Sequence, residues 1–427
     1  MSSPYAIRSM VFTSGERFPI MFDQVAGEPV FEPNVYALTQ LRATNRASNT
    51  IDQQLRAVMV LYIFWRLRQI DFDLRLEEGK VLELGEVEDL VRLCRRPVKE
   101  LLSMLASGPE QEKKSMQLVP EKCRMRQGLA KERHDLVSAS SRVLYIRNYL
   151  DWLVKNRLSK RNLDRQTFVV LESAGRAMFR ALTERIPCAA RRGNIDAREA
   201  IDSETLLKLK ALIDPASMDN PWLSEFTRQR NALMIHWLVG LGLRRGELLG
   251  VRISNIDFRK NTVDIVRRAD DPNDPRRYEP KAKTSDRVLA LSDSLVLMTK
   301  NYIMNVRSQG KPGLKHDFLM VSKGTCSPLS LIGMSKVFEV LRAKCPTLPS
   351  DLTAHVLRHT WNVLFSETCD KNHISSDDEE TWRNYMMGWA PNSKMAKVYT
   401  ARHIRERASE ISLKMQNKML SETKDGQ

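Results

Sequence analysis

Cysteine is scarce in this sequence, and the few cysteines are not placed as a metal site or a disulfide framework would need. Six cysteines are scattered over 427 residues without a Cys-x-x-Cys pair. One His-x-x-x-His pair, His355 with His359, has no such cysteine pair to join it, so neither zinc nor disulfides are predicted. The chain also lacks a Gly-x-x-x-x-Gly-Lys-Ser/Thr loop, which excludes nucleotide hydrolysis through that loop. We expect no cofactor and no metal.

Long apolar stretches are missing as well. The longest run without a formal charge extends from Asn231 to Leu243, which is shorter than the roughly 20 residues that a helix needs to cross a bilayer. No N-terminal segment joins a basic region to a long apolar one, as a secretory signal would. We therefore expect no membrane partner and a cytoplasmic, nucleoid-associated protein. A hydrophobic content of 42% still allows two or three packed domains.

Acidic residues are in the minority. The chain has 52 of them against 68 lysines and arginines, which gives a net charge of +16 and a pI of about 9.6. Such an excess favours nucleic acid as the partner, because basic side chains release counterions from phosphates. Basic residues recur in Arg185–Arg198, Arg267–Arg268, Arg276–Arg277, Arg402, Arg405 and Arg407. We expect some of them to contact a DNA backbone and others to be solvated surface charges.

Three short clusters late in the chain combine residue types that suit phosphate chemistry: Gly242-Leu243-Arg244-Arg245-Gly246-Glu247, His355–Thr360, and Met387–Trp389 followed by Val398-Tyr399. The planar fork of arginine matches a phosphate. His355, Arg358 and His359 are spaced i, i+3 and i+4, so one helix face can present all three. Tyr399 would need cations or a base nearby, because only about one tyrosine in a thousand is ionised at neutral pH. The clusters predict a phosphate clamp with a nucleophile.

An acid for the departing sugar oxygen is the remaining requirement, and a lysine at a hairpin tip could supply it. Lys283 lies in the polar stretch 281–286. The segments on either side of it, 261–266 and 287–291, alternate as strands do. We therefore predict a β-hairpin that carries Lys283.

In this order the motifs resemble those of the tyrosine recombinases, the family of phage integrases, over roughly the last half of the chain. The resemblance implies catalytic roles for Arg244, Lys283, His355, Arg358, Trp389 and Tyr399, with Glu247 and His359 as supporting residues. It selects Lys283 over Lys281, and it implies a 3′-phosphotyrosyl intermediate formed without metal or ATP. Glu247 is expected to orient the hydrogen-bond network around Arg244 and not to take a proton.

The resemblance also implies a biological task and partners. The task is site-specific recombination of double-stranded DNA for a mobile element, with a dimer on each site and a tetramer in synapsis. A second recombinase or an accessory protein stays open as a further partner. Two alternatives remain: a type IB topoisomerase, which uses a similar set of residues, and an inactive DNA-binding regulator with the same fold. The regulator would fit the spacing of Trp389 and Tyr399, which lie ten positions apart, one more than the family usually has.

The predicted fold is mostly α-helical with a small antiparallel β-sheet. By the resemblance, a helical, SAM-like core-binding domain precedes a mixed α/β tyrosine-recombinase catalytic domain. Several prolines predict an irregular or partly extended arm at the N-terminus. The predicted parts are the arm over 1–32, the core-binding domain over 33–185 with a polar insertion near 104–135, a linker over 186–199, the catalytic domain over 200–410 and a tail over 411–427.

Apolar spacing predicts individual helices. One covers 51–67, another covers 143–156 after Ser138–Ser141, and an amphipathic helix covers 402–420. The polar stretch 369–380 is predicted to be a surface insertion.

Overall fold

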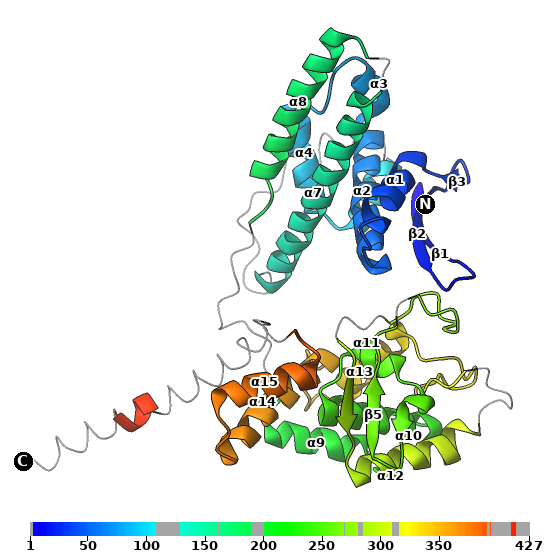
Figure 1. Cartoon of the computed structure of the whole chain (residues 1–427), viewed down its shortest axis with the longest axis vertical. Coiled ribbons are helices and arrows are strands. Elements are labelled where there is room, and N and C mark those ends of the chain that lie inside the picture. The colour runs from blue at the N-terminus through cyan, green and yellow to red at the C-terminus, as the bar shows by residue number, and fades with distance from the viewer. Residues whose placement is uncertain are drawn as a thin grey trace, which may run out of the picture. The chain divides into compact units, whose positions relative to one another are not determined.

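The structure is a computed structural model of the chain (Figure 1), in which part of the residues are described. The described residues are 3–107, 129–160, 163–188, 200–268, 270–280, 285–309, 316–390, 393 and 411–415. The chain divides into two compact units, Met1–Phe12 with Arg17–Arg191, and Thr13–Glu16 with Arg192–Gln427. In the described residues each unit is mainly helical and contains one small antiparallel sheet, so the predicted fold class is confirmed.

Helix α2 (Ser48–Arg68) is the centre of the first unit. Its side chains at Leu55, Val58 and Met59 are buried, as the apolar spacing over 51–67 predicts. It packs against α7 (Leu129–Leu158), which in turn packs against α8 (Arg165–Glu184), as Figure 1 shows. The smaller elements of this unit are α1 (Phe31–Tyr36), a π-helical turn (Ala37–Arg42), α3 (Phe72–Glu77), α4 (Leu84–Cys94) and α5 (Val98–Ser107).

The N-terminal segment forms a sheet where an irregular or partly extended arm was expected. Its strands are β1 (Tyr5–Val11), β2 (Arg17–Asp23) and β3 (Glu28–Pro29), paired antiparallel in that order. Phe18 and Met21 are buried, and β2 packs on α2. Because β3 pairs only with Phe22 and Asp23, β2 has an open edge at Pro19, where a missing N–H is tolerated.

Helix α7 begins earlier than the sequence predicts. It already includes Ser138–Ser141, which were expected to precede a helix. Ser141 Oγ donates to the carbonyl of Val137 at 3.1 Å, a local bond that lets serine remain inside a helix. The predicted insertion near 104–135 is therefore helical at both ends, up to Ser107 and from Leu129, while 108–128 lie outside the described residues. In the predicted tail helix, only 411–415 are described, and they are helical.

The second unit is built around α10 (Glu225–Leu241), which packs against α12 (Asp293–Tyr302) and α14 (Ala354–Lys371). Its sheet has the order β4 (Ile256–Asp257), β5 (Thr262–Ile265) and β6 (Arg287–Ala290). Strands β5 and β6 pair antiparallel from Thr262 opposite Ala290 to Ile265 opposite Arg287, so both predicted strands are confirmed. The other elements are α9 (Ser203–Ile213), α11 (Arg245–Gly250), a 3₁₀ turn (Ile253–Asn255), a π-helical turn (Ile303–Arg307), α13 (Leu331–Lys344) and α15 (Ser376–Met387).

The polar stretch 369–380 is only partly the surface insertion that was predicted. It spans the end of α14, a short turn and the start of α15. Cys369 and Glu379 are buried, and the carboxylate of Glu379 pairs with Arg383. Cys369 and Glu379 therefore pack between α14 and α15, while seven of the eight residues in 371–378 are exposed. Within the described parts of the chain, no helix is long and apolar enough to cross a membrane.

Candidate active site

The turn between α10 and α11 brings Arg244 to the site. Gly242 ends α10 with a left-handed φ of +59°. A Cβ added there would lie 2.7 Å from Met387 Cε and 2.8 Å from Trp361 Cδ2, so both the conformation and the space require glycine. The Gly242 carbonyl accepts a hydrogen bond from Arg358 Nη1 at 2.6 Å. The Gly-Leu-Arg motif thus joins the end of α10 to Arg358 and places Arg244 at the start of α11.

Glu247 is a buried carboxylate that three arginines share, and its side chain is 0% exposed. Its Oε1 accepts from Arg244 Nη1 at 3.3 Å, and its Oε2 accepts from Arg287 Nη2 at 3.0 Å. Arg358 Nη1 lies 3.8 Å from the same Oε2. Oε2 also accepts the backbone N–H of Arg244 at 2.9 Å. The negative charge of Glu247 offsets the mutual repulsion of the three guanidinium groups, a geometry consistent with the expected orienting role.

Arg287 is a site residue that was not predicted from the sequence, which indicated only that Arg287 lies in a strand. Its side chain is 1% exposed. Its Nε donates to the Met386 carbonyl at 2.8 Å, in addition to the Glu247 contact. A signal was available: Arg287 and Leu289 share the buried face of β6. An arginine at an inward position of a strand requires a buried acidic partner.

Helix α14 carries the histidine and arginine cluster, as its spacing predicts. The helix begins after Thr353, whose Oγ1 accepts the Val356 N–H at 3.4 Å. Arg358 is 2% exposed and donates from Nη2 to the Met387 carbonyl at 3.3 Å. The Nε2 atoms of His355 and His359 lie 3.1 Å apart. Only one hydrogen fits between them, so one ring is unprotonated at that nitrogen.

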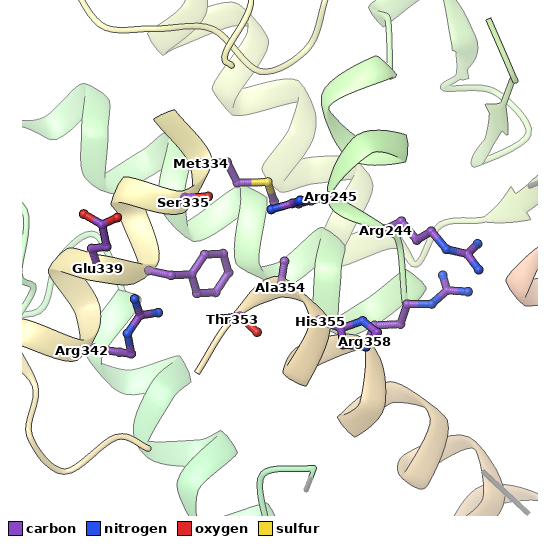
Figure 2. A pocket seen from close by; sticks show the side chains of 11 residues that line it. Arg244, Arg245, Met334, Ser335, Glu339, Arg342, Thr353, Ala354, His355 and Arg358 are labelled. Atoms are coloured by element: carbon purple, nitrogen blue, oxygen red, sulfur yellow. The ribbon is translucent and has the colours of Figure 1, made fainter. Parts of the chain in front are cut away.

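A cavity of about 480 Å³ opens beside these residues. Figure 2 shows the side chains of Arg244, Arg358 and His355 at one end, and those of Glu339 and Arg342 at the other. The arginine end presents several N–H donors and positive charge. Such an end suits a phosphodiester, whose oxygens accept hydrogen bonds from guanidinium groups.

Trp389 and Ser285 lie at the turn after α15. Gly388 ends that helix with a φ of +63°, and Trp389 follows, half-buried. The Arg358 guanidinium carbon lies 5.6 Å from the Trp389 ring centre. The Ser285 N–H donates to the Gly388 carbonyl at 3.1 Å, which anchors the chain just after segment 281–284. Lys283 and Tyr399 themselves lie outside the described residues.

Arg276, one of the basic residues considered for contact with DNA, is buried. It pairs with Asp274 at 2.7 Å. Its Nη1 donates to the carbonyls of Leu249 and Leu329 at 3.0 and 2.9 Å, and its guanidinium lies 4.5 Å from the centre of the Phe318 ring. With its charge balanced and its donors occupied, Arg276 supports the protein interior.

Two further histidines, His236 and His316, have a pKa that burial lowers. Burial lowers the pKa of His236, and the positive charge of Lys210 lowers it further. Burial also lowers the pKa of His316, whose Nε2 donates to the Cys326 carbonyl at 2.9 Å. Across the described ranges, no three His, Cys, Asp or Glu side chains are grouped as they would be around a metal ion.

Comparison with known proteins gives a family and several solved structures. Residues 215–376 match the model of the phage integrase family. No curated protein matches. Three solved structures are similar. XerH site-specific recombinase bound to difH substrate has 16% identity and a TM-score of 0.42, and the match covers 82% of this chain and 93% of that one. The Tn1549 transposon integrase in complex with a circular intermediate DNA has 15% identity and a TM-score of 0.39, with 67% of this chain and 95% of that one covered, and XerA recombinase has 18% identity and a TM-score of 0.36, with 70% and 95% covered in the same order.

Proposed function

We propose that this chain, whose residues 215–376 match the model of the phage integrase family, is a tyrosine recombinase that carries out site-specific recombination of double-stranded DNA. One observation carries the proposal: Arg244 and Arg358 are fixed around the buried Glu247 at one end of a cavity that His355 also lines. Cations fixed before the reaction stabilise charge as it develops on a phosphate, with no reorganisation during the step.

In the proposed reaction the hydroxyl oxygen of Tyr399 attacks the scissile phosphorus, and the bond from phosphorus to the 5′ oxygen breaks. His355 assists removal of the tyrosine proton, and its contact with His359 fixes the orientation of the ring. Lys283 gives a proton to the departing 5′ oxygen. The product is a 3′-phosphotyrosyl link, which keeps the energy of the bond. A 5′ hydroxyl of a partner strand can therefore reverse the step on new DNA.

The phosphate itself is held by Arg244 and Arg358 through its non-bridging oxygens, and the ring N–H of Trp389 adds a further donor. Glu247 takes no proton in this scheme. It keeps the two arginines at fixed positions through contacts of 3.3 and 3.8 Å. We propose a dimer on each site and a tetramer in synapsis for exchange between two duplexes, with double-stranded DNA of a mobile element as the substrate.

A covalent adduct tests this function. The protein is incubated, without metal or ATP, with a duplex that carries the element-end sequence and a nick beside the scissile phosphate. The short 5′-hydroxyl fragment then diffuses away and the adduct accumulates on a denaturing gel. We expect an adduct with the wild-type protein and none with Tyr399→Phe. The Kd for the same DNA should change less than about fivefold, since a lost hydroxyl contributes at most ~1 kcal/mol.

The matched control is Tyr385→Phe, which should still form the adduct. Tyr385 is exposed on α15, and its hydroxyl donates to the Val288 carbonyl at 3.1 Å. Tight DNA binding by the wild-type protein without any adduct would contradict the proposed function and favour the inactive regulator. An adduct that is never transferred to a second duplex would favour the topoisomerase.

A further inference from the structure

We infer that Arg383 is a positioning residue for the proposed cleavage, because it fixes α15 where the last turn of that helix holds the catalytic arginines. The inference rests on the proposed function and extends it to a residue that no family motif marks. Arg383 lies on α15, one turn before the end of the helix, and its side chain is 0% exposed.

The end of α15 is the point where the parts of the site converge. Three successive carbonyls accept four donors: Met386 from Arg287 Nε at 2.8 Å, Met387 from Arg244 Nη1 and Arg358 Nη2 at 3.3 Å each, and Gly388 from the Ser285 N–H at 3.1 Å. Carbonyls in the last turn of a helix lack partners within the helix and carry the negative end of its dipole. They therefore suit guanidinium groups, and a shift of α15 would move both catalytic arginines.

Arg383 ties α15 to α14. Its Nη1 donates to the backbone carbonyl and to Oδ1 of Asn362, both at 3.1 Å, and its Nη2 donates to Ser366 Oγ at 2.6 Å. Both partners lie on α14. The carboxylate of Glu379, one turn earlier on α15, balances the charge of Arg383. The planar fork reaches two turns of the neighbouring helix at once, which a lysine cannot do.

Asn362 connects this contact to the catalytic arginine. Its Nδ2 donates to the backbone carbonyl of Arg358 at 2.8 Å and lies 3.6 Å from Met387 Sδ. One side chain therefore joins Arg383 to the backbone of Arg358 and to the residue whose carbonyl Arg358 and Arg244 share. A buried ion pair seldom adds stability over a well-packed apolar pair. Holding a geometry is the role that these contacts fit.

The test replaces the ion pair without leaving a buried charge. In the double variant Arg383→Met with Glu379→Leu, apolar side chains of similar length take the place of both partners, so folding should survive. We expect cleavage of the nicked duplex to slow about 10²-fold, because a misplacement of ~1 Å is enough for such a loss. A second variant, Asn362→Ala, keeps the ion pair and removes only the link, and about a tenfold loss is expected.

A control pair and a neutral substrate separate positioning from general damage. Glu204→Leu with Lys208→Met changes an exposed i, i+4 pair on α9 and should leave the rate unchanged.

The second substrate carries a methylphosphonate at the scissile position, which lacks the negative charge that the arginines hold. Because misplaced arginines matter less for a neutral group, the rate ratio of wild type to the Arg383 double variant should fall from about 10² to less than about 5.

Two outcomes would overturn the inference. The first is an undiminished cleavage rate in both the double variant and Asn362→Ala. The second is an equal loss of cleavage rate on both substrates, which would mean only that fewer molecules are folded. Circular dichroism of each variant reports its fold independently of cleavage. A wild-type protein that forms no adduct would instead overturn the proposed function, so the two failures are distinguishable.

Discussion

Replacing Arg358 by lysine is expected to slow strand cleavage about 10²–10³-fold, equivalent to ~3–4 kcal/mol in the barrier. The guanidinium group of Arg358 spans the Gly242 carbonyl at 2.6 Å, the Met387 carbonyl at 3.3 Å and the Glu247 carboxylate at 3.8 Å. An ammonium group keeps the charge but is a single point of attachment. It cannot hold these partners and a phosphate oxygen at the same time.

The measurement is the single-turnover rate of adduct formation, with DNA affinity determined in parallel. Affinity should change less than about threefold, because the charge is retained and most of the binding energy comes from other phosphate contacts. Arg259→Lys is the matched control: Arg259 is exposed in the turn between β4 and β5, and its replacement should not alter the rate. An Arg358→Lys protein that cleaves at the wild-type rate would show that Arg358 does not hold the scissile phosphate.

Replacing Glu247 by glutamine should destabilise the second unit by about 3–5 kcal/mol, because it leaves buried cations without their counter-charge. Arg287 is 1% exposed and Arg358 is 2% exposed, and both contact this carboxylate. Hydrogen exchange of peptides from α10 and α14 in increasing urea gives the free energy of unfolding of this unit separately from the first.

The control for this prediction is Glu339→Gln. Glu339 pairs with Lys336 at 3.0 Å on an exposed surface, where such a pair contributes under ~1 kcal/mol. Adding Arg287→Met to Glu247→Gln should recover part of the lost stability, since one unpaired cation is removed. If Glu247→Gln unfolds at the wild-type urea concentration, then Glu247 is not the shared counter-charge of the three arginines.

The elements of the second unit that follow from local periodicity were predictable from sequence. The i, i+3, i+4 spacing of His355, Arg358 and His359 depends only on helix geometry, and α14 has it. The alternation on either side of the lysine stretch likewise gives β5 and β6. Such patterns can be recognised in the sequence because they depend only on residues that are close together along the chain.

Arg287 and Arg383 could not be assigned roles in this way, because their partners are distant in sequence. Arg287 reaches Glu247 and the Met386 carbonyl across the site, and Arg383 reaches Asn362 on the neighbouring helix. In a chain with 68 lysines and arginines, the residue type alone gives no signal of burial, and only the inward position of Arg287 on its strand hints at it. The N-terminal sheet was missed for a related reason: prolines were read as breakers, although one of them lies beside an open strand edge.

The most direct test of the proposed chemistry is to locate the DNA on the protein. The adduct from the nicked duplex is digested with nuclease and trypsin, and the peptide that carries the remaining nucleotide is sequenced by mass spectrometry. Cleavage after Lys397 and Arg402 releases Tyr399 in a five-residue peptide, 398–402. We expect the nucleotide there, joined through its 3′ phosphate to the tyrosine oxygen. A nucleotide on another peptide, such as 384–394 with Tyr385, would contradict the assignment of Tyr399 as the nucleophile.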